Sequence, residues 1–271
     1  MALTTIGLMA LLGCFAGFMA GLLRIGGGMI ITPFLIMLIP SSLIPHEHIV
    51  HVAIATSLAT IAFTSLSSVR AHHKRGAVLW NVVASVAPGI LVGAVVGAQI
   101  AGWLPTFWLS LIFAAFVGFS AFKMFLNKSP RPDRNLPGTI GKFFMGIAIG
   151  ILSALVGAGG GFISVPWMIW CNVKMQNAVA TSAAFGFPIA LFGTIGYIIS
   201  GWNVSGLPPW PIDLGYICIP ALFSVAITSV LFAPLGAKVA HSIDTKPLKK
   251  IFACLLCFVC LYMIRQAYLA M

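Results

Sequence analysis

Long apolar segments without charged residues alternate with short polar loops along the whole chain. A helix that spans a bilayer needs about 20 predominantly apolar residues. The hydropathy pattern predicts helical segments over residues 3–23, 29–45, 49–70, 79–101, 104–126, 141–157, 161–173, 176–200, 213–236 and 248–269. The pattern therefore predicts an all-α polytopic membrane protein, with the lipid bilayer as its main partner.

Composition supports this prediction and excludes a water-soluble domain. Of 271 residues, 60% are hydrophobic and only 7% are charged, whereas soluble domains carry about a quarter charged residues. The formal net charge is +11, but the cations gather in short loops. This distribution is typical of orientation signals in a membrane protein, and we expect no nucleic-acid partner.

Basic residues mark one side of the predicted membrane protein. With the exceptions of Arg24 and Arg265, they occur in Arg70–Arg75, Lys123–Lys142, at Lys174 and in Lys238–Lys250. Because cytoplasmic loops carry an excess of Lys and Arg, we place these regions inside. Both termini are then predicted outside, and the 127–140 loop is predicted to be cytoplasmic.

An internal repeat divides the chain. Gly13 and Gly17 correspond to Gly146 and Gly150, and two glycine triplets, each followed by a proline, also correspond. The sequence Ala-Thr-Ser recurs in the following helix of each half. We predict a first repeat over 1–126, a linker over 127–140 and a second repeat over 141–271. Since each repeat has an odd number of segments, the second is predicted to be inverted relative to the first.

The glycine triplets Gly26–Gly28 and Gly159–Gly161 weaken any continuous helix. The uncharged stretch between Lys142 and Lys174 is too short for two full spans. We therefore predict a hairpin of two half-helices of about 14 residues each, turning at Gly159–Gly161 near the bilayer midplane. Residues 1–45 are predicted to turn likewise at Gly26–Gly28, although they are long enough for two full spans.

A helix that begins next to each triplet offers unpaired N–H groups and a positive dipole end, which favour an anion. The alternative is that the triplets only permit close helix packing. We expect packing alone for two other series of glycines: Gly13, Gly17 and Gly21, and Gly89, Gly93 and Gly97.

Other side chains are candidates for the same site. Arg24 lies next to the first triplet and either contacts an anion or only orients the hairpin. Thr56 and Ser57 correspond to Thr181 and Ser182. Their hydroxyls either donate to an anion or bond to nearby helix carbonyls.

Two clusters invite a metal interpretation, and we favour simpler ones. His46, Glu47, His48 and His51 are interpreted as a solvated loop, with proton exchange or a metal site as alternatives. The cysteines of Cys254–Cys260 lie in an apolar run and are interpreted as small apolar residues. No metal or cofactor is therefore predicted.

Carboxylates are scarce in the predicted membrane region. The only candidates for buried acids are Glu47 and Asp213, and both are expected near the outer face. A buried carboxylate for proton transfer is therefore not expected. No convergent set of His, Cys or carboxylates suggests a catalytic residue, and we predict no enzyme activity.

The segments LRIGGGMIITP (Leu23–Pro33) and VGAGGGFISVP (Val156–Pro166), with Ala-Thr-Ser in each following helix, resemble the sulfite exporter TauE/SafE family. The resemblance covers essentially the whole chain. It implies a carrier of sulfite, organosulfonates such as sulfoacetate, or related anions in the bacterial inner membrane. It further implies export toward the periplasm and coupling to an ion gradient. Arg24 departs from the small or uncharged residues usual at this turn.

Together these patterns predict an alternating-access exporter of a small sulfur-containing anion, assembled as a monomer or a homodimer. An importer of sulfate or thiosulfate and a non-transporting assembly partner are the alternatives. The predicted substrate-binding residues are Arg24, Gly26, Gly27, Gly28, Thr56, Ser57, Gly159, Gly160, Gly161, Thr181 and Ser182.

Overall fold

The protein is a bundle of apolar helices, seen in a computed structural model that describes residues 3–23, 28–40, 43–126, 134–208, 212–239 and 245–270. The described residues form ten α-helices and one two-stranded sheet. The first five helices are α1 (Leu3–Leu23), α2 (Gly28–Leu38), α3 (Ile49–Lys74), α4 (Trp80–Trp103) and α5 (Thr106–Leu126). The others are α6 (Thr139–Val156), α7 (Gly161–Trp170), α8 (Met175–Gly201), α9 (Ile219–Val239) and α10 (Thr245–Leu269).

Eight of the described helices are long and apolar enough to cross a membrane, and α2 and α7 are shorter apolar helices. The prediction of an all-α polytopic membrane protein is therefore confirmed. Each predicted segment overlaps one of the helices.

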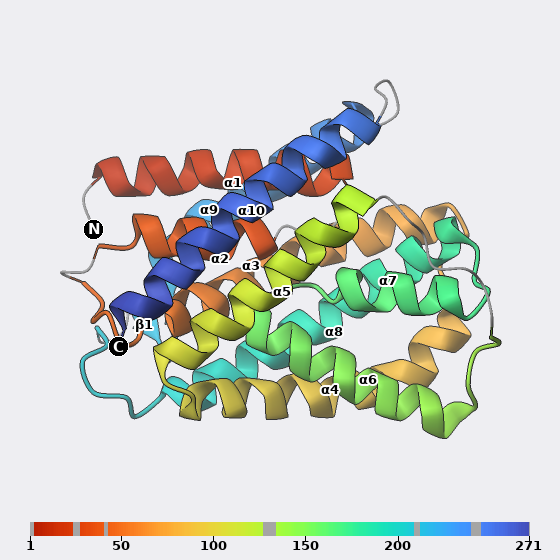
Figure 1. Cartoon of the computed structure of the whole chain (residues 1–271), viewed down its shortest axis with the longest axis horizontal. Helices are drawn as coiled ribbons and strands as arrows, with labels where there is room; N and C mark the ends of the chain where they lie inside the picture. Colours follow the sequence, from red (N-terminus) through yellow and green to blue (C-terminus); the bar gives the residue numbers. More distant parts are fainter. Residues whose placement is uncertain are drawn as a thin grey trace.

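The helices alternate in direction along the long axis (Figure 1). Both ends of the chain lie at the left end of this view, together with the β1–β2 hairpin. At the opposite end, Arg134 contacts the end of α7: its guanidinium lies 4.9 Å from the centre of the Trp170 ring. This arrangement agrees with the prediction that the basic loops lie at one end of the bundle. That this end faces the cytoplasm stays a prediction.

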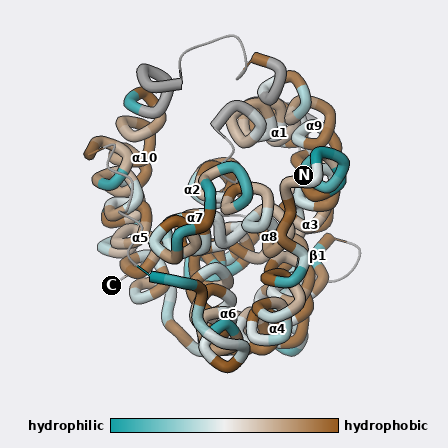
Figure 2. The backbone as a smooth tube through the Cα atoms, turned by 90° about the vertical axis from the view of Figure 1, so that its right-hand side faces the viewer, coloured by the Kyte–Doolittle hydropathy of each residue, from teal (hydrophilic) through white to brown (hydrophobic). Residues whose placement is uncertain are grey.

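Three pairs of helices form the outside of the bundle (Figure 2). Viewed along the long axis, α1 lies beside α9, α4 beside α6, and α5 beside α10, with α2, α7 and α8 between the pairs. In each pair one helix comes from the first repeat and the other from the second. The repeat equates α1 with α6 and α9 with α4, so the pairs α1–α9 and α6–α4 correspond to each other. The inversion itself stays a prediction.

Glycines allow these pairs to approach closely. A Cβ at Gly89 or Gly93 would overlap backbone atoms of α6 at Phe143 and Ile147, and one at Gly13 would overlap backbone atoms of α9. Gly17 and Gly97 make equivalent contacts. The packing role predicted for these glycines is therefore confirmed, with Gly21 outside this comparison.

The two glycine-rich hairpins differ from the predicted equal half-helices. Helix α6 has 18 residues and α7 has 10, and α1 has 21 against 11 in α2. Helix α6 is longer than expected because it continues past Lys142 to Thr139. It ends at Gly157, before the triplet, so the turn runs from Gly157 to Gly160 rather than over Gly159–Gly161.

A second correction concerns the segment predicted as helix from residue 213. Residues 213–218 instead form an antiparallel hairpin of β1 (Asp213–Leu214) and β2 (Ile217–Cys218), in which Asp213 pairs with Cys218. Gly215 has φ +60 and sits against the backbone of Ile198 on α8. This left-handed residue permits a tight turn inside the apolar segment.

Candidate functional site

The turn between α6 and α7 depends on two left-handed glycines. Gly157, with φ +64, ends α6, and its N–H donates to the carbonyl of Ser153. Gly160, with φ +74, immediately precedes α7. Because L side chains rarely adopt this conformation, glycine is the residue expected at both positions.

The start of α7 presents unpaired backbone donors. The N–H groups of Ile163 and Ser164 donate to the carbonyl of Gly160, at 3.1 and 2.9 Å. The first N–H groups of a helix have no partner within it, and those of Gly161 and Phe162 have no hydrogen-bond partner among the described residues. Unpaired donors of this kind, at the positive end of a helix dipole, favour an anion over a cation.

Glycine-rich segments of the two repeats meet at this place. A Cβ at Gly28, the first residue of α2, would overlap the carbonyl oxygen of Gly157. Ser57 of α3 reaches both segments: its Oγ lies 3.4 Å from the carbonyl oxygen of Gly28 and 3.3 Å from that of Gly157. The shared hydroxyl donor holds α2 and the α6–α7 turn together.

Ser182 occupies the corresponding place at α7. Its hydroxyl lies 2.7 Å from that of Ser164, which also donates to the carbonyl of Gly160 at 2.9 Å. A Cβ at Gly161 would lie 3.5 Å from Ser182 Oγ. The structure thus brings both predicted serines to the glycine-rich segments.

The two predicted threonines make a different contact. Thr56 Oγ1 accepts the N–H of Cys218, immediately before α9, at 3.0 Å. Thr181 Oγ1 accepts the N–H of Leu79, immediately before α4, at 3.0 Å. Each threonine therefore caps the start of a helix that belongs to the other predicted repeat. The two contacts occupy equivalent positions in the two predicted repeats.

Two hydroxyls that the sequence analysis did not select lie at the same turn. Thr32 is fully buried, and its Oγ1 would be 3.0 Å from a Cβ at Gly157. Ser153 is 1% exposed, and its Oγ would be 3.3 Å from a Cβ at Gly160. Neither hydroxyl has a hydrogen-bond partner among the described residues. Buried hydroxyls are seldom left unpaired, so these groups are available to a bound molecule. The signal in the sequence that could have identified them is their proximity to the glycine-rich segments.

Of the predicted site residues, the structure brings together Gly28, Ser57, Gly159, Gly160, Gly161 and Ser182. It places Thr56 and Thr181 at helix starts. Arg24, Gly26 and Gly27 lie outside the described residues. The site that results is lined by hydroxyls and backbone groups, which suit hydrogen bonding to an oxyanion without its chemical conversion.

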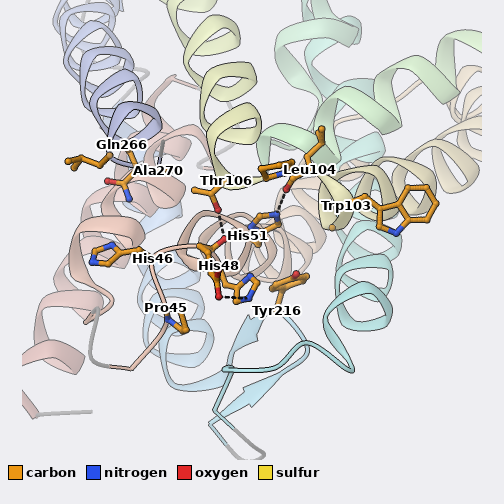
Figure 3. A pocket seen from close by; sticks show the side chains of 14 residues that line it. Pro45, His46, His48, His51, Trp103, Leu104, Thr106, Tyr216, Gln266 and Ala270 are labelled. Atoms are coloured by element: carbon orange, nitrogen blue, oxygen red, sulfur yellow. Dashed lines mark hydrogen bonds and ion pairs between the residues drawn. The ribbon is translucent and has the colours of Figure 1, made fainter.

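A hollow lies at the end of the bundle that carries the β1–β2 hairpin. It has a volume of about 690 Å³ and is lined by His46, Glu47, His48, His51 and Tyr216, together with the loop between α4 and α5 (Figure 3). His51 is 3% exposed. Its Nε2 donates to the carbonyls of Ala101 and Leu104, at 3.0 Å each.

This arrangement corrects the interpretation of a solvated loop for His51 alone, because His46 and Glu47 are exposed as that interpretation predicts. The ring of His51 stacks on Tyr216 with 5.1 Å between the ring centres, and His48 Nε2 lies 3.6 Å from Glu47 Oε1. His51 is buried because the chain enters α3 beneath the α4–α5 loop. Among the described residues, no group of three His, Cys, Asp or Glu side chains is arranged to hold a metal ion.

Known proteins are similar to this chain over nearly its whole length. The sulfite exporter TauE/SafE family matches residues 9–263, nearly the whole chain. The chain belongs to this family. No solved structure matches it.

Relatives of this TauE/SafE member are described as transporters. It is 34% identical to a probable membrane transporter protein of Haemophilus influenzae, over 96% of this chain and 98% of that one. It is 30% identical to the probable membrane transporter protein YdhB of Bacillus subtilis, over 72% and 78%. A probable membrane transporter protein of Methanocaldococcus jannaschii is 27% identical over 95% and 94%. The chain is therefore a multi-pass membrane transporter of the TauE/SafE family.

Proposed function

We propose that this transporter exports a small sulfur-containing anion, sulfite or an organosulfonate such as sulfoacetate, by alternating access. The anion binds between the glycine-rich segments, at Gly28, Gly157–Gly161, Ser57 and Ser182. Thr32 and Ser153 complete the site. The described residues of the site offer hydrogen-bond donors and no nucleophile paired with a base, which supports transport of the anion without its conversion.

The observation that carries this proposal is the pair of unpartnered buried hydroxyls beside the start of α7. An oxyanion has several acceptor oxygens and satisfies hydroxyls and helix N–H groups together. A cation has no such affinity for a row of donors at the positive end of a helix dipole.

Orientation and direction follow from charge. We place the 127–140 linker in the cytoplasm and both termini in the periplasm of a bacterial inner membrane, because cytoplasmic loops carry an excess of Lys and Arg. Export of an anion from a cell that is negative inside gains about 2.3 kcal/mol per charge per 100 mV. An importer of sulfate or thiosulfate is the alternative, in which a second gradient reverses the direction.

The binding test uses purified protein in detergent and a panel of sulfite, sulfoacetate, taurine, thiosulfate, sulfate and chloride. A true substrate at about a hundred times its Kd stabilises the folded state by about 2.7 kcal/mol. We expect a raised unfolding temperature with sulfite or sulfoacetate and none with chloride. Equal shifts with all six compounds would contradict a selective site.

A matched pair of variants locates the site. Ser153→Ala removes a buried, unpartnered hydroxyl at the turn, and Ser110→Ala removes one on α5. The ligand-induced shift should shrink in Ser153→Ala and remain in Ser110→Ala. If both variants respond like the unmodified protein, the anion binds elsewhere.

A further inference from the structure

Asp213, in the β1–β2 hairpin, is a buried acid without a partner. Its side chain is 4% exposed, and neither carboxylate oxygen has a hydrogen-bond partner among the described residues. Burying an ionised carboxylate without compensation is costly, and such a group tends to take up a proton instead. This burial corrects the expectation that the chain has no buried carboxylate for proton transfer.

Among the described residues, the elements packed against β2 place no Lys or Arg beside Asp213. Strand β2 packs against α3, α8 and α9. The titratable groups on these elements and on the hairpin are Cys218, Tyr216, Tyr197, His48, His51, His72, His73, Arg70, Lys74 and Lys238. The basic residues among them, except His48 and His51, belong to the far ends of α3 and α9. Burial raises the pKa of Asp213 to about 7, against a smaller opposing effect of the Cys218 thiol.

The hairpin is connected to the candidate anion site through Cys218, which lies opposite Asp213, and through the start of α3. Cys218 pairs with Asp213 in the hairpin, and its N–H donates to Thr56 Oγ1. The next residue, Ser57, bonds to the carbonyls of Gly28 and Gly157. A shift of the hairpin when Asp213 gains or loses charge is thereby transmitted to the glycine-rich segments.

We propose that Asp213 is a proton-binding site linked to the anion site, so that binding of the anion and binding of a proton favour each other. This inference rests on the proposed anion transport. An ionised Asp213 repels an anion at the glycine-rich segments, and a neutral Asp213 does not. Because linkage is reciprocal, anion binding draws a proton onto Asp213 to the same extent.

The outer cavity borders this hairpin. Tyr216 lines the cavity with Glu47 and His48, at the end of the bundle at which we place the periplasm (Figure 3). Asp213 lies on β1 and is not among the residues that line the cavity. A sodium ion is the competing occupant, but it needs several oxygen ligands, whereas the residue paired with Asp213 is a cysteine.

The first experiment measures proton uptake with a pH-sensitive dye in weakly buffered detergent solution near pH 7, on addition of the anion that stabilises the protein. We expect uptake of up to about one proton per anion in the unmodified protein. Asp213→Asn should bind the anion and take up no proton. Glu47→Gln, which neutralises an exposed acid, should take up protons normally. Anion binding without proton uptake in the unmodified protein would overturn the proposal, as would binding that requires sodium.

A second measurement separates this proposal from the proposed function. Infrared titration of the carboxyl band, compared between the unmodified protein and Asp213→Asn, reports the protonation of Asp213 without any anion. Titration near neutral pH supports the proton site even if no anion in the panel binds. Titration below about pH 5, in the normal range of a carboxyl group, overturns it whether or not an anion binds. Asp213→Glu, which keeps the carboxyl group, replaces the asparagine variant if the latter does not fold.

Discussion

Gly28 of the first repeat packs directly on the carbonyl oxygen of Gly157 of the second, with no space between them for a Cβ atom. This contact brings the start of α2 to the end of α6. Ser57 closes it by bonding to the carbonyl groups of both glycines. Any side chain at Gly28 has to push the two repeats apart at the place where we locate the anion.

Substitution of Gly28 by alanine is therefore expected to reduce anion flux in proteoliposomes about tenfold or more, with a stability cost of about 1–3 kcal/mol. Gly7→Ala is the control, because a Cβ at Gly7 on α1 meets nothing within 4 Å. This control should gain slightly in stability, since alanine favours a helix. Equal flux in both variants would show that the contact between the repeats is not needed for transport.

A pair of variants, at Gly160 and at Gly76, separates the effect of a changed α6–α7 turn from the effect of backbone strain. Gly160→Ala is strained by its φ of +74, and its Cβ would also meet the Ile189 side chain at 2.5 Å. Gly76→Ala has similar strain, with φ +65, but open space around it. We expect loss of anion binding only in the Gly160 variant, measured by thermal shift. If Gly76→Ala also loses binding, strain alone explains the effect. Gly160→Leu should abolish transport while the protein remains inserted in the membrane.

Thr56 and Thr181 should behave as a matched pair. Valine at either position removes a hydroxyl that accepts a backbone N–H before α9 or α4. Each change is expected to lower stability by about 1 kcal/mol. Anion affinity should fall far less than in Ser153→Ala, because the threonines act on helix starts. A large loss of affinity with unchanged stability would instead place these hydroxyls on the substrate.

Stability should depend on pH through Asp213. Its pKa is about 7 in the folded protein against 3.8 for the free side chain. Between these values the folded state holds a proton that the unfolded state has lost. Stability therefore falls as pH rises through this window and changes no further above it. Unfolding temperatures measured from pH 4 to pH 8 should show this decline in the unmodified protein and in Glu47→Gln. A similar decline in Asp213→Asn would assign it to another group.

The sequence predicted the helices well because hydrophobic length is a strong signal in a membrane protein. Segment 141–157 became α6, and segment 161–173 became α7. Their boundaries were predicted to within three residues. The pattern of glycines alone does not reveal that Gly157 and Gly160 adopt the left-handed conformation.

The site was predicted only in part, for a physical reason. Repetition identified Ser57 and Ser182, but Thr32 and Ser153 have no hydroxyl equivalents in the other repeat. The sequence also treats Asp213 as a residue near the surface. Its burial depends on a hairpin of six residues inside an apolar segment, and on packing against α8 and α9, both of which are tertiary effects.

The glycine contacts between α4 and α6, and between α1 and α9, join each repeat to the other along whole helices. If transport proceeds by the proposed alternating access, each body that moves as a unit therefore contains helices from both predicted repeats. The closest described contacts between the repeats are made by these helices. The two repeats should therefore stay assembled even if the backbone is cut between them.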